Sequence, residues 1–139
     1  MTEFVSDVKA ILYNDADVYR VLSDPRKLEL VKERIPEDKI KDFTFDEESI
    51  SFHVDPIGKV RFLVVEREQN KLVKFKSENL PFEVFLWIQL VSIAEKETRL
   101  RMTLKADLNP FIKGMVEKPM KEAVDKISDA LTQLPYDQI

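Results

Sequence analysis

The sequence predicts a single α+β domain in which an antiparallel sheet wraps around a C-terminal helix. Three observations support this prediction. Apolar and polar residues alternate along seven segments, which is the pattern of half-buried strands. Signals for two short helices lie between the first and second of these segments. After Asn109 and Pro110 in the sequence, apolar residues recur at helical spacing up to the C-terminal region.

The composition fits one domain with one core. The chain has 139 residues, of which 44% are hydrophobic and 35% charged, a mixture typical of globular proteins. No apolar run reaches the ~20 residues that a membrane helix needs, and residues 1–9 lack the pattern of a secretory signal. The absence of cysteine excludes disulfides, thiolate catalysis and thiolate metal sites. We therefore expect a cytoplasmic protein without a membrane span.

The charge and the glycine content argue against two classes of partner. The formal net charge is −4, which does not favour a general nucleic-acid binder. The two glycines, Gly58 and Gly114, cannot build a phosphate-binding loop or a dinucleotide fingerprint. We expect neither a nucleic-acid partner nor a cofactor.

The N-terminal third predicts one strand followed by two short helices. Residues 4–13 alternate as a strand, and Asn14 can cap the helix that follows. Asp24 and Pro25 form a second helix start, and Pro36 ends that helix. The strand residues expected to face the interior are Phe4, Ser6, Val8, Ala10 and Leu12.

Six further strands are predicted as a series of hairpins. The acidic residues 46–49 connect the first two, and residues 55–58 (DPIG) suit a type I turn. In the first of these strands, Phe43 and Phe45 are expected to point inward. In the third, Val60, Phe62 and Val64 share the inward face. The six segments span residues 40–45, 50–54, 60–67, 72–77, 83–93 and 98–106.

The C-terminal helix is predicted from Pro110 to about Leu134. Asn109 caps it, and Pro119 inside it should remove a backbone hydrogen bond and bend the helix. One face is apolar, as expected for a helix that packs on a sheet. This face comprises Ile112, Met115, Val116, Met120, Ala123, Val124, Ile127, Leu131 and Leu134.

This order of elements resembles the START-like, or SRPBCC, superfamily, which includes polyketide cyclases, lipid-transfer proteins and pollen allergens of the helix-grip type. Residues 18–25 (VYRVLSDP) with Leu28, and the helix entered at Asn109, carry the resemblance, which covers residues 1–139 as one domain. It implies a helix-grip fold: a curved antiparallel seven-stranded sheet, two short helices after strand one, and a long C-terminal helix across the concave face. It also implies a cavity between sheet and helix, but no single function, because a fold hosts many activities.

The predicted inward face carries no chemistry for catalysis. Its central positions are apolar, whereas acid–base catalysis needs a carboxylate, His or Lys near the substrate. The sole histidine, His53, alternates with Phe52 and Val54 and so points to the other face. One His and no Cys leave only carboxylate ligands for a metal, and we expect no metal site. With the cavity that the resemblance implies, we predict binding of a small hydrophobic or amphipathic ligand, lipid- or polyketide-like, without catalysis. The ligand-binding residues are predicted to be Phe52, Phe62, Phe75, Ile88, Met102, Met115 and Met120.

Other interpretations stay open at this point. The apolar interior can be a filled core, or the pocket of a cyclase- or aromatase-type enzyme that acts by shape and polar groups at its mouth. The outer sheet face sets Lys and Arg beside Phe85 and Trp87, as in cross-strand cation–π pairs, a stacking platform for single-stranded nucleic acid, or a protein interface. A solvated face, with Trp87 under lysine and arginine stems, is the simplest reading. Among the functional ones we favour a homodimer through Trp87, Phe85 and Arg101, because apolar residues would otherwise be exposed.

Overall fold

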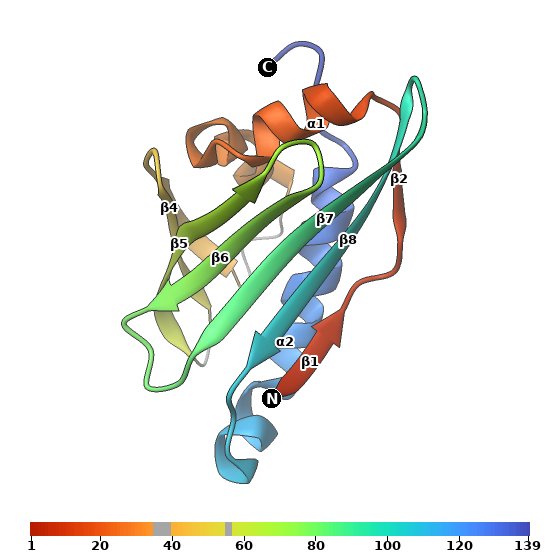
Figure 1. Ribbon diagram of the computed structural model, residues 1–139. Helices are drawn as coiled ribbons and strands as arrows, with labels where there is room; N and C mark the ends of the chain where they lie inside the picture. The colour runs from red at the N-terminus through yellow and green to blue at the C-terminus, as the bar shows by residue number, and fades with distance from the viewer. Residues whose placement is uncertain (35–39, 55–56) are drawn as a thin grey trace.

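The computed structural model describes residues 1–34, 40–54 and 57–139, and it has the predicted architecture (Figure 1). One antiparallel sheet curves around a long C-terminal helix, α2 (Pro110–Leu131). The strands are ordered β1-β8-β7-β6-β5-β4-β3, and β2 also pairs with β8. Their bounds are β1 Thr2–Val5, β2 Lys9–Ile11, β3 Ile40–Phe45, β4 Ser49–Val54, β5 Gly58–Glu68, β6 Leu72–Glu78, β7 Val84–Ala94 and β8 Glu97–Ala106.

The predicted first strand is divided into β1 and β2, which corrects part of the inward assignment. Between them, the Ser6 amide donates to the Met102 carbonyl oxygen (2.9 Å), and the Ser6 hydroxyl accepts from the Met102 amide (2.9 Å). Pairing then resumes at Lys9 opposite Leu100. Because an irregularity of this kind changes which side chains face inward, Phe4, Ser6 and Ile11 are buried. The expectation that Val8, Ala10 and Leu12 face the interior is wrong, since all three are exposed.

The remaining strands follow the predicted alternation closely. On β5 the buried side chains are Val60, Phe62 and Val64. The long β7–β8 hairpin keeps its register from Val84 opposite Ala106 to Ser92 opposite Thr98 and shifts before Ala94. Phe43 and Phe45 of β3 pack against the core as expected. The register shifts once in β5, between Val64 and Glu66.

The helices begin where their caps predict. The Asn14 side chain accepts from the Asp17 amide (2.8 Å) at the start of α1 (Asp15–Leu22). The second short helix, η1 (Pro25–Arg34), is a 3₁₀ helix. At the start of α2, the Asn109 side chain accepts from the Ile112 amide (2.9 Å), and Pro119 lies within the helix. The predicted helix end at Pro36 and the turn residues 55–56 lie outside the described residues. No described helix has the length and apolarity needed to cross a membrane.

The C-terminal segment closes one end of the core through Tyr136, which is fully buried. Its hydroxyl donates to the Leu131 carbonyl oxygen (2.5 Å), and its ring packs edge-on against Tyr13, with centroids 5.7 Å apart. The Arg20 guanidinium donates to the Tyr136 carbonyl oxygen (2.9 Å), which joins α1 to this segment. Burial raises the pKa of the Tyr136 phenol, because the interior disfavours the phenolate.

This burial predicts a specific loss of stability at alkaline pH. The folded pKa of Tyr136 lies above its ordinary value of 10.0, so its contribution is complete below pH 10 and falls as the pH rises further. Between pH 9 and pH 11 the free energy of unfolding should fall by about 1.4 kcal/mol through this group alone. Urea unfolding of wild type and Tyr136→Phe at both pH values measures the difference. Equal pH dependence in the two proteins would show that the phenol ionises without unfolding.

Candidate functional site

Two small adjoining cavities lie between the sheet and α2. The outer one has a volume of about 50 Å³ and reaches from Ile57 and Leu80 to Met120 and Ala123. The inner one has a volume of about 60 Å³ and extends to Leu28 of η1. Both are lined by Phe52, Phe62, Leu86, Met102 and Ile127.

One wall of the cavities is a row of phenylalanine rings from β3, β4 and β5. The Phe43 centroid lies 5.9 Å from that of Phe45 and 5.3 Å from that of Phe52. Phe52 in turn stacks on Phe62 at 5.8 Å. Strand alternation puts these rings on one face, and antiparallel pairing places Phe45 opposite Ile50 and Phe52 opposite Val60. The result is a continuous row of aromatic rings turned toward the interior.

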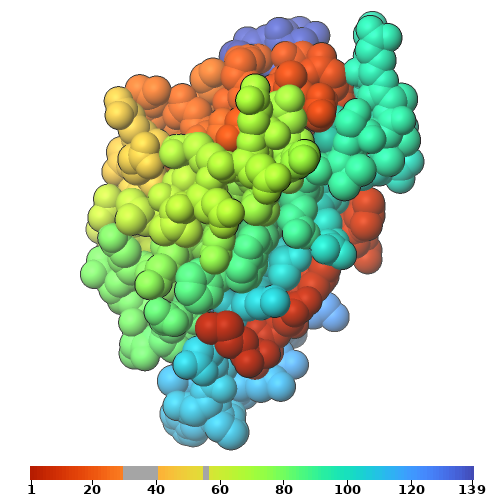
Figure 2. Space-filling model, in the orientation of Figure 1, coloured from red at the N-terminus to blue at the C-terminus, as the bar shows by residue number. Residues whose placement is uncertain are grey.

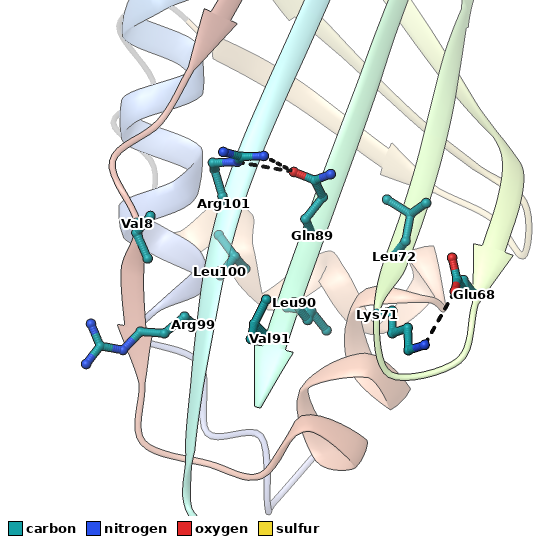
Figure 3. A pocket seen from close by; sticks show the side chains of 10 residues that line it. All are labelled: Val8, Glu68, Lys71, Leu72, Gln89, Leu90, Val91, Arg99, Leu100 and Arg101. Atoms are coloured by element: carbon teal, nitrogen blue, oxygen red, sulfur yellow. Dashed lines mark hydrogen bonds and ion pairs between the residues drawn. The ribbon is translucent and has the colours of Figure 1, made fainter. Parts of the chain in front are cut away.

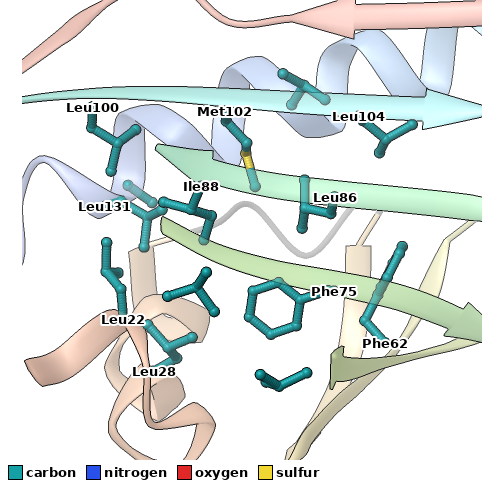
Figure 4. Close-up of a cluster of buried hydrophobic side chains, with 14 of the residues drawn as sticks. Leu22, Leu28, Phe62, Phe75, Leu86, Ile88, Leu100, Met102, Leu104 and Leu131 are labelled. Atoms are coloured by element: carbon teal, nitrogen blue, oxygen red, sulfur yellow. The ribbon is translucent and has the colours of Figure 1, made fainter. Parts of the chain in front are cut away.

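The opposite part of the interior is a close-packed aliphatic cluster. Figure 4 shows Met102 of β8 directed toward Leu86 and Ile88 of β7, with Phe75 of β6 beyond them. Phe75 is 0% exposed and Met102 2% exposed. Each cavity is smaller than the ~150 Å³ apolar cavity that is known to hold benzene. The interior is therefore intermediate between the filled core and the open pocket that the sequence allowed. It is a nearly filled core that retains two small adjoining cavities.

Six of the seven predicted ligand-binding residues line these cavities. Phe52, Phe62 and Met102 line both, Phe75 and Ile88 line the inner one, and Met120 lines the outer one. The expectation that Met115 lies on the buried face of α2 is wrong, because its side chain is 51% exposed and lines neither cavity.

Met115 lies four residues after Phe111, which is 78% exposed, and the two share the outward face of α2. Apolar spacing alone cannot separate the two faces here, because the first turns of α2 project past the sheet (Figure 1). The seven residues predicted to bind the ligand did not include Leu86 and Ile127, which line both cavities. The apolar face of the C-terminal helix had already marked Ile127 as inward.

The cavity linings offer no group for acid–base or metal chemistry. Every residue that lines either cavity is apolar. Among the described residues, no group of three or more His, Cys, Asp or Glu side chains could hold a metal ion. His53 pairs with Lys41 on one side and Lys59 on the other, and it lines neither cavity.

The carboxyl groups whose pKa values are shifted, Asp24 and Asp46, line neither cavity. A hydrogen bond from Arg26 lowers the pKa of Asp24, and a hydrogen bond from the Ser49 hydroxyl lowers the pKa of Asp46. Arg26 also approaches Glu47 at 3.5 Å, which ties η1 to the acidic β3–β4 turn. These interactions connect elements of the fold and do not form a reaction centre.

The outer sheet face contains the predicted cation–π pairs. The Lys74 ammonium lies 4.8 Å from the Phe85 ring centroid and 5.0 Å from that of Trp87. The Lys105 ammonium lies 5.5 Å from the Trp87 ring. Both rings are half-buried, so lysine side chains cover much of the aromatic surface. Arg101 takes no part in these cation–π pairs, because it lies opposite Gln89 and donates a hydrogen bond to the Gln89 side-chain oxygen.

A curved antiparallel sheet that grips a long C-terminal helix over an apolar interior defines the START-like, helix-grip class of fold, and this chain has that fold. Norcoclaurine synthase from Thalictrum flavum, solved as a point mutant in complex with a transition-state analogue, is similar over 99% of this chain and 95% of its own, with a TM-score of 0.72 and 14% identity. A START superfamily protein from Mycobacterium smegmatis covers 94% of each chain, with a TM-score of 0.64 and 14% identity.

A third similar structure, the Thermus thermophilus protein TTHA0849, covers 95% of each chain with a TM-score of 0.68 and 20% identity. At these identities the likeness establishes the fold alone. No protein-family model matches the sequence, and the search of curated proteins finds no significant match.

Proposed function

We propose that this protein binds a small apolar or weakly amphipathic ligand, of aromatic or short acyl type, between its sheet and α2 and does not transform it. The observation that carries the proposal is the pair of adjoining cavities with wholly apolar linings. Ligand sites are commonly apolar spaces of about 300–1,000 Å³, so binding here requires the two cavities to join and expand.

The side chains shared by the two cavities are suited to such an expansion. Met102 is unbranched and flexible, and methionine adapts readily to irregular space. Phe52 and Ile127 are only partly buried, so they can move outward with a smaller loss of burial than a fully buried residue. The row of phenylalanine rings then offers an aromatic wall that an aromatic ligand can pack against.

The fold relatives give limited support on ligand type. Norcoclaurine synthase has also been solved in complex with dopamine and hydroxybenzaldehyde, two small aromatic compounds. That likeness also keeps an enzymatic function as the second candidate. We favour binding, because general acid–base catalysis requires an ionisable group within hydrogen-bond reach of the substrate, and both linings are apolar.

A homodimer through the outer sheet face stays a prediction with weaker support. Phe85 and Trp87 already contact Lys74, and Lys105 lies over Trp87, so little bare aromatic surface is left for a second copy. A symmetric interface centred there would also bring like charges together.

A cavity-filling substitution tests the proposed ligand site. Ala123 is half-buried on α2 and lines the outer cavity, so Ala123→Leu places additional methyl and methylene groups in the space that a ligand needs. We expect affinity for hydroxybenzaldehyde, or for the best binder in a calorimetric screen of aromatics and fatty acids, to fall at least tenfold. The free energy of unfolding should stay constant or rise by about 1 kcal/mol, because apolar groups become buried.

Ala16→Leu is the matched control, since Ala16 is exposed on α1 and the same atoms are added away from the interior. This variant should bind as wild type does. An equal loss of affinity in both variants, or full binding by Ala123→Leu, would place the ligand outside these cavities. A bound compound that is chemically converted by wild type would favour the enzymatic candidate.

A further inference from the structure

The convex outer face of the sheet, which faces the viewer in Figure 2, carries a depression that is larger than the interior cavities and separate from them (Figure 3). Its volume is about 450 Å³, within the range of small-molecule sites. It crosses β6, β7 and β8 between two boundaries, the end of the β5–β6 hairpin and the segment that joins β1 to β2. We call this depression the outer groove.

Part of the outer groove is unusually apolar for an exposed surface. Val91 on β7 is 60% exposed and Val8 is 59% exposed, and Leu72 of β6 lies half-buried beside them. Val8 reaches this surface because the break between β1 and β2 turns it away from the interior. These side chains form an apolar strip that β8 interrupts, with Val8 on one side of that strand and Val91 and Leu72 on the other. A short apolar group on either side could lose contact with water.

Arg101 lies on β8, between the two parts of this strip, and its guanidinium is held in place by a neutral partner. Its Nε and Nη2 atoms donate to the Gln89 side-chain oxygen at 3.2 and 2.9 Å. By contrast, the nearby Arg99 is paired with the Glu97 carboxylate at 3.0 Å. Among the arginine side chains that the structure describes, Arg101 alone has no carboxylate within 4 Å; the others are Arg20, Arg26, Arg61, Arg67 and Arg99.

This arrangement favours an anionic group as the missing partner of Arg101. An amide oxygen orients a guanidinium without neutralising it, and a planar guanidinium matches the oxygens of a carboxylate or a phosphate. The Lys71 ammonium lines the same groove and approaches the Glu68 carboxylate only at 3.8 Å, in an exposed pair of small energy. The groove thus combines an apolar strip with an oriented, uncompensated cation.

We propose that the outer groove binds an amphipathic oxyanion, in which a carboxylate or phosphate meets Arg101 and a short apolar tail lies over Val91 or over Val8. This site is independent of the proposed interior site, because the two lie on opposite faces of the sheet. The head group supplies the charge that Gln89 does not, and the tail covers apolar side chains that are otherwise in contact with water.

The test is an amide NMR titration with hexanoate, hexyl phosphate and hexanol, carried out on wild type and on Ala123→Leu. The Ala123→Leu background keeps the interior filled, so binding in the groove should persist there. We expect both anions to shift the amide signals of residues 71–72, 89–91 and 99–101, and hexanol to bind at least tenfold more weakly. Hexanol that binds as tightly as the anions, or signal changes confined to interior residues such as Phe52 and Met102, would overturn the proposal.

Two matched variants separate a specific contact from general electrostatic attraction. Arg101→Gln should weaken the binding of both anions at least tenfold, whereas Arg99→Gln removes a guanidinium that is already paired with Glu97 and should change it less than threefold. Equal losses in the two variants would mean that the groove attracts anions only diffusely and would refute the Arg101 contact. If neither anion shifts any amide signal at concentrations up to 10 mM, which is about 100 times the Kd of a 0.1 mM site, the site itself is refuted.

Discussion

Replacing Phe75 with alanine should lower the free energy of unfolding by about 3–5 kcal/mol. Phe75 is 0% exposed on β6, where it lines the inner cavity and lies among Leu86, Ile88 and Met102. The loss combines the removal of a buried ring from the core with the space left behind, because the surrounding side chains can close only partly. Urea unfolding monitored by circular dichroism measures it.

Phe75→Ala should also create a site for a small aromatic ligand. The inner cavity of about 60 Å³ gains the volume of the ring and approaches the ~150 Å³ known to hold benzene. Saturating benzene should therefore raise the melting temperature of the variant and leave that of wild type almost unchanged. If the variant is destabilised as expected but shows no response to benzene, the neighbouring side chains have filled the space.

Phe85→Ala is the control for this substitution, because Phe85 lies on the next strand but faces outward. Its ring is half-buried, and it contacts the Lys74 ammonium at 4.8 Å. We expect a loss of about 1 kcal/mol, from a cation–π contact and partial burial. Equal costs at Phe75 and Phe85 would contradict the assignment of the two sheet faces.

A negative charge on the buried face of α2 should destabilise the protein nearly as much. Val124 is 2% exposed and lines the outer cavity, where the surroundings are apolar. Val124→Asp must either bury a carboxylate without a partner or protonate it, and we expect a cost of at least about 3 kcal/mol at pH 7. Because protonation removes the charge, the cost should become smaller at pH 4, relative to wild type at the same pH.

Met115→Asp is the matched control on the same helix, since Met115 is 51% exposed. A carboxylate near the N-terminus of a helix is favourable, so the change in unfolding free energy should stay within about 0.5 kcal/mol. Thermal and urea unfolding of the two variants decide the comparison. A large cost for Met115→Asp would return Met115 to the interior, where the helical spacing had suggested it lies.

Local signals in the sequence were sufficient for the starts of the helices and for strands β3–β8. Asn14 and Asn109 cap the helices as predicted, because a short side-chain oxygen can satisfy amides that lack a partner within the helix. The predicted β3–β8 strands lie within about two residues of the observed ones, because alternation repeats over many positions. Five of the seven residues expected to bind the ligand line the cavities because of the same alternation, and Met120 does so because of the helical spacing of α2.

The errors occurred where one local event changes the facing of many side chains. The pairing of Ser6 with Met102 divides the first strand, after which Val8 points outward and Ile11 inward. Nothing in the composition of residues 4–13 marks that change, since apolar residues occupy both faces there. Met115 was misplaced for a related reason, because a helix that projects past its sheet exposes residues on any side.

The sequence by itself determined an α+β chain with an apolar inward face that lacks acid, base and metal ligands, because periodicity and residue type are local properties. Only the tertiary structure decided how much space remains inside, since a cavity is the small difference between the volume that the backbone encloses and the volume that side chains fill. It also decided which arginine lacks an acidic partner. Arg99 and Arg101 look equivalent in the sequence, and strand register places Gln89, a neutral residue, opposite Arg101.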